Sequence, residues 1–286
     1  MAKLVFTTTG CWENTENFGC ASLGLAGKCS NDMAMQARWP VELDGIIFSG
    51  TYEEVMQAAA KVCEPVHAAI VLFGNAGGEN EFLSRFRELF ACPTVGGGAA
   101  IDAATGRSAL ITGGNQVAVF LITDDRYTYT AHTQCIHDHI LERCTLTLQD
   151  SRTIRTINGE DAAVFLAGKK RELGLKDTDF EHLTLSDKRN VNAHLSNERG
   201  VIKSGRDLQE TMLLRYVEHS AVYDAMRAFY DDPDAIIFGC AGLSGLLDRP
   251  LDTDSLGLFL FGEVCTVDGI PEFGNLMLSK LRISKK

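Results

Sequence analysis

The chain has 286 residues, of which 45% are hydrophobic and 23% charged, values typical of a globular protein with a substantial core. Its formal net charge of −11 argues against a general affinity for nucleic acids or anionic membranes, because both select clustered lysine and arginine. The apolar run at residues 4–6 is too short for a signal peptide, and no later run reaches the roughly 20 apolar residues of a membrane span. We therefore expect a cytoplasmic protein whose nine cysteines are mostly free thiols, with neither nucleic-acid nor membrane partners.

Short apolar runs bounded by turn residues predict buried strands along the chain. In chain order these runs are Leu4–Thr8, Gly45–Phe48, Ala68–Phe73, Ala109–Thr112, Val117–Thr123, Ala235–Phe238 and Leu256–Phe261. Apolar residues at helical spacing between the runs predict three amphipathic helices. These helices are Tyr52–Val62, Glu81–Phe90 and Ser220–Tyr230. Because strands and helices alternate, the sequence predicts an α/β fold.

Two further segments, Ser151–Arg155 and Met212–Val217, roughly alternate polar and apolar residues. This pattern predicts half-buried antiparallel strands, so we expect mixed sheets rather than purely parallel ones. The charged segment Asp187–Arg189 is interpreted as a solvated turn.

Two segments of the chain match each other, and this match suggests how the chain divides into domains. The segment Phe73–Gly77 aligns with Phe238–Gly242, an offset of 165 residues from position 73 to position 238, and the same offset places Gly97 opposite Gly262. We therefore predict an internal duplication into two related halves, residues 1–150 and 151–286, whose sheets pack together with helices outside. Residues 1–40 fit neither half well.

Glycines at the ends of these strands favour a ligand site. Such glycines permit positive φ or close backbone approach, and ligands of open α/β sheets bind where strands end. The alternative is that the glycines only allow the two halves to pack against each other.

The second half resembles a known family. The run Ala235–Gly242, then Leu258–Val264 and Glu272–Asn275, resembles the end of the FIST domain, a bacterial and archaeal sensory domain. Asn158–Ala162 resembles the start of the C-terminal FIST portion. Two earlier segments, Ala69–Gly74 and Cys92–Ala99, resemble the N-terminal portion. The resemblance therefore covers residues 40–283.

The chain departs from the family pattern at two positions. Leu243 stands where the family usually has arginine, and Gly274 stands where it has histidine. Polar ligand contacts from those two family positions are therefore not carried over to this chain.

The resemblance implies a sensory protein in signal transduction that binds a small ligand, an amino acid or related metabolite, at the interface of the halves. Any output would come from a separate signalling protein, and the sequence leaves the oligomeric state open, a homo-oligomer included. The residues expected to bind the ligand lie at strand ends and in the following loops. They are Asn75, Gly77, Gly97, Gly98, Cys240, Gly242, Ser244, Glu263 and Asn275.

Two alternatives involve reactive groups. Cys240 resembles a nucleophile at a strand end and would make the chain an enzyme, but Phe238 occupies the position where a nucleophile elbow has glycine. Part of the family's relatives bind haem and sense nitric oxide, and His132, His137 and His139 are the candidate metal or haem ligands here.

Three N-terminal cysteines recur every nine residues, at Cys11, Cys20 and Cys29. Metal sites usually contain closer pairs, so this spacing predicts no site. Taken together, we expect a binding protein rather than an enzyme.

Overall fold

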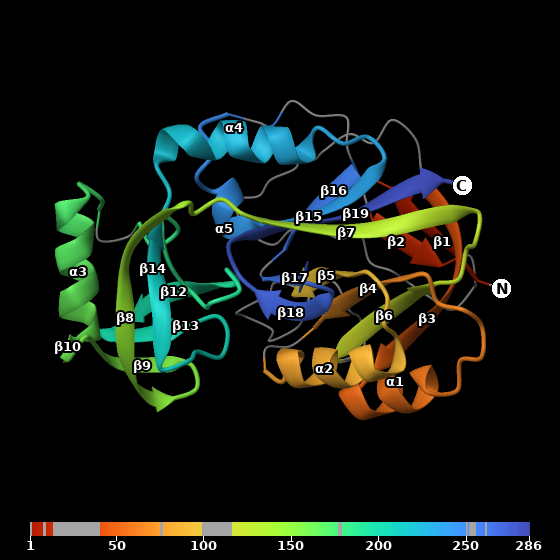
Figure 1. The fold of residues 1–286 in the computed structure, drawn as a ribbon, viewed down its shortest axis with the longest axis horizontal. Helices are drawn as coiled ribbons and strands as arrows, with labels where there is room; N and C mark the ends of the chain where they lie inside the picture. The colour runs from red at the N-terminus through yellow and green to blue at the C-terminus, as the bar shows by residue number, and fades with distance from the viewer. Residues whose placement is uncertain are drawn as a thin grey trace.

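The computed structural model describes residues 2–7, 10–13, 41–74, 77–98, 116–176, 179–249, 251, 256–260 and 262–286. In these ranges the chain builds two regions that lie side by side, a four-layer sandwich and a small closed barrel (Figure 1). The predicted α/β class with mixed sheets is confirmed, since parallel and antiparallel pairs occur in the same sheets.

The first sheet of the sandwich has eight strands in the order β18-β17-β5-β4-β6-β3-β1-β2. Its strands are β1 (Ala2–Thr7), β2 (Gly10–Glu13), β3 (Val41–Gly50), β4 (Ala68–Phe73), β5 (Thr94–Gly98), β6 (Val117–Ile122), β17 (Glu263–Val267) and β18 (Ile270–Gly274). Only β4 and β5 pair in parallel, and β4 is buried along its whole length. The helices α1 (Tyr52–Ala59) and α2 (Glu79–Leu89) cover one face of this sheet, and a capping box between Thr51 and Glu54 starts α1.

The second sheet has four strands in the order β16-β15-β19-β7. Its strands are β7 (Tyr127–Cys135), β15 (Ala235–Cys240), β16 (Leu256–Leu260) and β19 (Met277–Lys285). The helix α4 (His219–Tyr230) packs on its outer face through Val222, Met226 and Tyr230, beside the short helix α5 (Ala241–Ser244).

The two sheets pack face to face over one apolar core. Ile70 and Phe120 of the first sheet lie in the same buried cluster as Ile236, Phe238 and Leu281 of the second. Figure 1 shows the resulting layers, with α4 on one outer side and α1 and α2 on the other. Packed sheets with helices outside are thus confirmed.

The two sheets share a topology. The order β5-β4-β6-β3 in the first corresponds to β16-β15-β19-β7 in the second, with one parallel and two antiparallel pairs in matching places. The duplication itself remains a prediction. Gly97 and Gly262 do not hold equivalent positions, because Gly97 lies within β5 while Gly262 lies beyond the end of β16.

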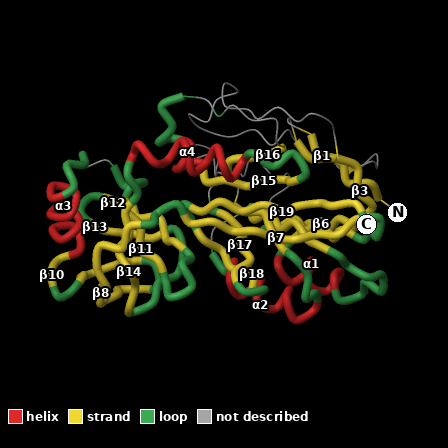
Figure 2. The backbone as a smooth tube through the Cα atoms, turned by 45° about the horizontal axis from the view of Figure 1, so that its top comes forward, coloured by secondary structure: helices red, strands yellow, loops and turns green. Residues whose placement is uncertain are grey.

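The barrel consists of antiparallel strands that close on themselves. Six strands follow the ring β8-β9-β13-β12-β11-β14 and return to β8, because β9 pairs with both β8 and β13. They are β8 (His139–Asp150), β9 (Thr153–Ile157), β11 (Leu183–Ser186), β12 (Asn192–Glu198), β13 (Val201–Ser204) and β14 (Thr211–Tyr216), with β10 (Glu160–Asp161) beside β9. The helix α3 (Ala162–Glu172) lies beside the barrel strands (Figure 2). It contributes Phe165 and Leu166 to the barrel core.

Strand pairing crosses the predicted boundary near Asp150 in every sheet. The hairpin β17–β18 joins the first sheet, β7 joins the second, and β8 belongs to the barrel together with β9 to β14. The predicted strand Ala109–Thr112 lies outside the described residues. No helix in the described ranges is long and apolar enough to cross a membrane.

Candidate functional site

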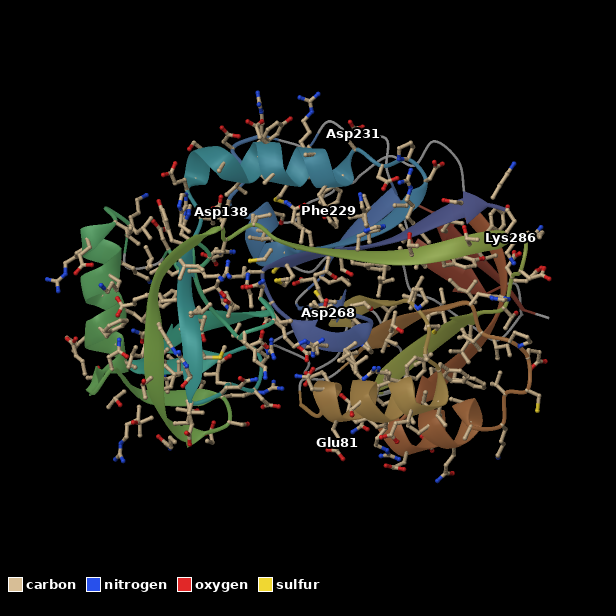
Figure 3. All side chains as sticks on the ribbon, in the orientation of Figure 1. Glu81, Asp138, Phe229, Asp231, Asp268 and Lys286 are labelled. Carbon is tan, nitrogen blue, oxygen red and sulfur yellow. The ribbon has the colours of Figure 1, made fainter. Side chains whose placement is uncertain are left out.

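The hairpin β17–β18 has one apolar and one polar face. Its turn, Asp268–Gly269, has positive φ at both residues, as tight hairpin turns require. Because side chains alternate along a strand, Val264 and Phe273 point toward the core beneath α1 and α2. Glu263, Cys265 and Glu272 therefore lie on the opposite face, toward β7 and the barrel, and Figure 3 shows side chains of both regions at this junction.

The carboxyl ends of three strands meet at Glu263. Cys240, the last residue of β15, pairs with Leu260, the last residue of β16. Glu263 pairs with Gly97 of β5, and the Gly98 amide donates to the Gly262 carbonyl at 2.9 Å. The pairing of these strand ends brings together four residues predicted to bind the ligand, namely Gly97, Gly98, Cys240 and Glu263. The predicted contacts to a ligand stay predictions.

Close backbone packing explains the glycines here. A Cβ atom on Gly97 would lie 2.2 Å from the Gly262 carbonyl oxygen, and one on Gly262 would lie 2.2 Å from the Phe273 ring. Gly262 also has a φ of +95°. Only glycine meets these requirements without displacing backbone or ring, so these positions serve the packing of sequence-distant segments.

The Glu263 carboxyl is completely buried and incompletely paired. Its Oε2 accepts a hydrogen bond from the Met277 amide at 3.0 Å, whereas Oε1 has no hydrogen-bond partner in the part of the chain that is described. Burial raises the pKa of Glu263 well above its ordinary range, although the Met277 amide, the Cys240 thiol and the Gly262 amide act in the opposite direction. The surroundings therefore favour the protonated, uncharged carboxyl.

Cys240 is a buried thiol next to this carboxyl. Burial raises the pKa of Cys240 well above its ordinary range, and an ionised Glu263 would raise it further. Since the thiolate is the nucleophilic form, this environment disfavours the nucleophile of the enzyme hypothesis. Gly242 packs beside it, because a Cβ there would lie 3.5 Å from the Cys240 sulfur and 2.9 Å from the Leu276 side chain.

Asn275 connects the site to the barrel. Its backbone amide donates to the Asn192 backbone carbonyl at 3.0 Å, and its side-chain Oδ1 accepts from the His194 backbone amide at 3.4 Å. Its side chain lies between Gly205 of the barrel and Gly262 of the sandwich. The carboxyl site thus lies where the two regions join.

Three other predicted ligand residues have different outcomes. The Ser244 hydroxyl donates to the Ala241 carbonyl at 2.7 Å within α5. The Gly77 amide donates to the Glu79 carboxylate at 2.7 Å at the start of α2. Asn75 lies outside the described residues.

A charged cluster, formed by Asp187, Arg189, Arg206 and Glu272, lies at the same junction. Arg206 donates to Asp187 at 3.2 Å, and Arg189 pairs with Glu272. The interpretation of Asp187–Arg189 as a solvated turn is wrong for Asp187, which is 2% exposed. No local pattern in the sequence marks the charged cluster, because its ion-pair partners are 19 and 83 residues apart.

The three candidate histidines do not form a joint site. His137 is buried, with Nε2 at 2.8 Å from the Glu181 carbonyl and Nδ1 at 3.4 Å from the Asn192 amide nitrogen, so both ring nitrogens are engaged. Burial lowers the pKa of His137 to about 4. His132 and His139 are exposed on the surface.

Metal ligands do not gather elsewhere either. Across the residues that the structure describes, no group of three histidine, cysteine or acidic side chains could hold a metal ion. Cys20, Cys29 and the side chain of Cys11 lie outside those residues. The cysteine side chains that are described are free thiols.

No protein-family model matches this chain, and a search of curated proteins finds no match.

Proposed function

We propose that this chain is a small-ligand-binding sensory protein of the FIST type, and that its ligand binds beside Glu263 at the junction of sandwich and barrel. The observation that carries the proposal is the completely buried Glu263 carboxyl, whose Oε1 has no partner among the described residues. Leaving a buried polar atom unpaired costs about 1–3 kcal/mol, so such an atom calls for an explanation. A ligand group that pairs with Oε1 supplies one.

Two further features support this place. The carboxyl ends of β5, β15 and β16 converge there, which is where ligands of α/β sheets commonly bind. The site also lies between regions that hold one another through Asn275, so a bound ligand would contact both. Such a position suits a sensor, because a ligand that contacts both regions can bind one arrangement of them more tightly than another.

The resemblance to the FIST domain supports the remaining parts of the proposal. It favours an amino acid or related metabolite as ligand, a cytoplasmic setting and a separate output protein. The raised pKa of Cys240 favours binding over thiol catalysis.

A binding measurement with a matched pair of variants tests the proposal. Thermal-shift screening of amino acids, amines and organic acids identifies a ligand, and calorimetry then measures its affinity for the wild type, Glu263→Gln and Glu142→Gln. Glu142 is a partly exposed carboxyl on the barrel strand β8, where it pairs with Lys169. We expect Glu263→Gln to weaken binding at least tenfold and Glu142→Gln to leave it unchanged. Equal affinity of all three proteins would place the ligand elsewhere.

A further inference from the structure

We infer that the group bound by Glu263 is an ammonium of a small amine that carries no carboxylate, and that it enters in exchange for a proton. This inference rests on the proposed function, since it narrows the ligand class of the same site. It follows from the charges around the junction.

Both arginines at the junction are ion-paired, although Arg206 Nε has no hydrogen-bond partner among the described residues. Arg206 pairs with Asp187 and Arg189 with Glu272, so the charged cluster contains two positive and two negative side chains and is electrically balanced. A ligand carboxylate placed there would add a charge with no counter-ion.

Arg152 and Arg215 are engaged as well. Arg152 pairs with Glu79 at 2.8 Å and with Asp207 at 3.0 Å. Arg215 donates to the Ser186 hydroxyl at 2.7 Å and to the His137 carbonyl at 3.0 Å. Binding a carboxylate to either would require breaking contacts that hold the barrel to its neighbours.

Glu263 is the opposite case. It is a buried carboxyl whose described contacts include no cation, and its Oε1 is open. A buried charge is stable only when it is paired, so an entering cation is the partner that would make the ionised form of this carboxyl stable. The net charge of −11 also favours the approach of cations over anions.

The exchange step balances in atoms and charge. The ammonium N–H forms a hydrogen bond to Oε1, the Glu263 O–H bond breaks, and the released proton passes to the buffer. Total charge is conserved, since one cation enters the site and one proton leaves it.

The neighbours of Glu263 do not compete for this proton. Its titratable neighbours include the thiols of Cys240 on β15 and Cys265 on β17, and burial raises the pKa of each. The Glu272 carboxyl, on the same face of the hairpin, already pairs with Arg189, and Glu181 lies beside Gly242. Proton release on binding is therefore assigned to Glu263.

Calorimetry of the full chain with matched probes tests the inference. Agmatine and arginine, cadaverine and lysine, and tyramine and tyrosine each differ only by the α-carboxylate. We expect at least one amine to bind at least tenfold more tightly than its amino acid at pH 7. Titrations in two buffers of different ionisation enthalpy should show release of up to one proton per amine, and Glu263→Gln should abolish both the release and the preference.

The outcomes separate this inference from the proposed function. If the amino acids bind more tightly than their amines and Glu263→Gln weakens them, the site stands and the ligand class inferred here is wrong. Binding of an amine without proton release would also overturn the exchange. If no probe binds and Glu263→Gln behaves as wild type in the wider screen, the inference and the proposed function both fail.

Discussion

Glu79 and Glu263 are both buried carboxyls, but their oxygens differ in how many partners they have. Each is the first residue of its element and directly follows a glycine. The Glu79 carboxylate accepts from the Gly77 amide at 2.7 Å and from Arg152 at 2.8 Å, so both of its oxygens are paired. The Glu263 Oε2 accepts a hydrogen bond from the Met277 amide, its Oε1 has no partner among the described residues, and its described contacts include no counter-ion. Burial therefore does not distinguish a structural carboxyl from a candidate binding group, whereas the presence of a counter-ion does.

The largest loss of stability is expected when Glu79, like Glu263, has no counter-ion. Arg152→Met removes the counter-ion of Glu79, and breaking a buried ion pair from one side costs about 3–5 kcal/mol. We expect a loss of that size in the free energy of unfolding, measured by urea denaturation.

Arg85→Met is the matched control for this change. Arg85 pairs with Glu53 on the surface, where ion pairs contribute little to stability. The urea midpoint of the Arg85→Met variant should therefore stay near that of the wild type. Equal losses for the two variants would show that the Arg152 pair has no special structural role.

An intermediate effect is expected from the backbone around Glu263. Gly97→Ala places a methyl group 2.2 Å from the Gly262 carbonyl oxygen, and overpacking of this kind costs about 1–3 kcal/mol. Gly168→Ala, within α3 and with nothing inside 4 Å, should instead be neutral or stabilising by up to about 1 kcal/mol. If both variants denature alike, close approach at Gly97 does not hold this end of the sandwich together.

The effect that is smallest per step of the measurement is a pH dependence of stability that depends on Glu263. Its pKa is raised in the folded protein from an ordinary value of 4.5, so the folded state holds this proton more tightly than the unfolded chain. Stability from this group is therefore complete below about pH 4.5 and is lost as the pH rises toward the folded-state pKa, by up to about 1.4 kcal/mol per pH unit.

Glu263→Gln cannot lose that proton. Relative to the wild type, its stability should therefore increase as the pH rises, which urea denaturation at pH 5, 6, 7 and 8 in the absence of ligand measures. A constant difference between the two proteins across this range would mean that Glu263 is already ionised in the empty site.

Elements with a strong local pattern were predictable from the sequence. The run Ala68–Phe73 is apolar throughout and forms β4 with the predicted bounds, and Ser220–Tyr230 forms α4 with one residue added at its start. The predicted helix Tyr52–Val62 ends earlier, at Ala59. The chain's own periodicity is sufficient in such segments because each buries one side or its whole length.

The candidate site was predictable only in part. Glu263 was identifiable because a carboxylate directly after an apolar strand is costly to bury unpaired, and Cys240 was identifiable by its place at a strand end. The charged cluster and the counter-ion of Glu79 were not, since Arg152 is 73 residues from Glu79 and Arg189 is 83 residues from Glu272.

The sequence by itself thus determined the class of the fold, the main strands and helices, and the residues at their ends, because these depend on hydrophobic patterns that are local. The tertiary structure alone decided which strand ends meet, that β17–β18 joins the first sheet, that the barrel closes through β8 and β9, and which carboxyl obtains a counter-ion. These outcomes depend on pairings across distances as long as the 172 residues between Thr94 and Thr266, and no periodicity within either segment specifies its partner.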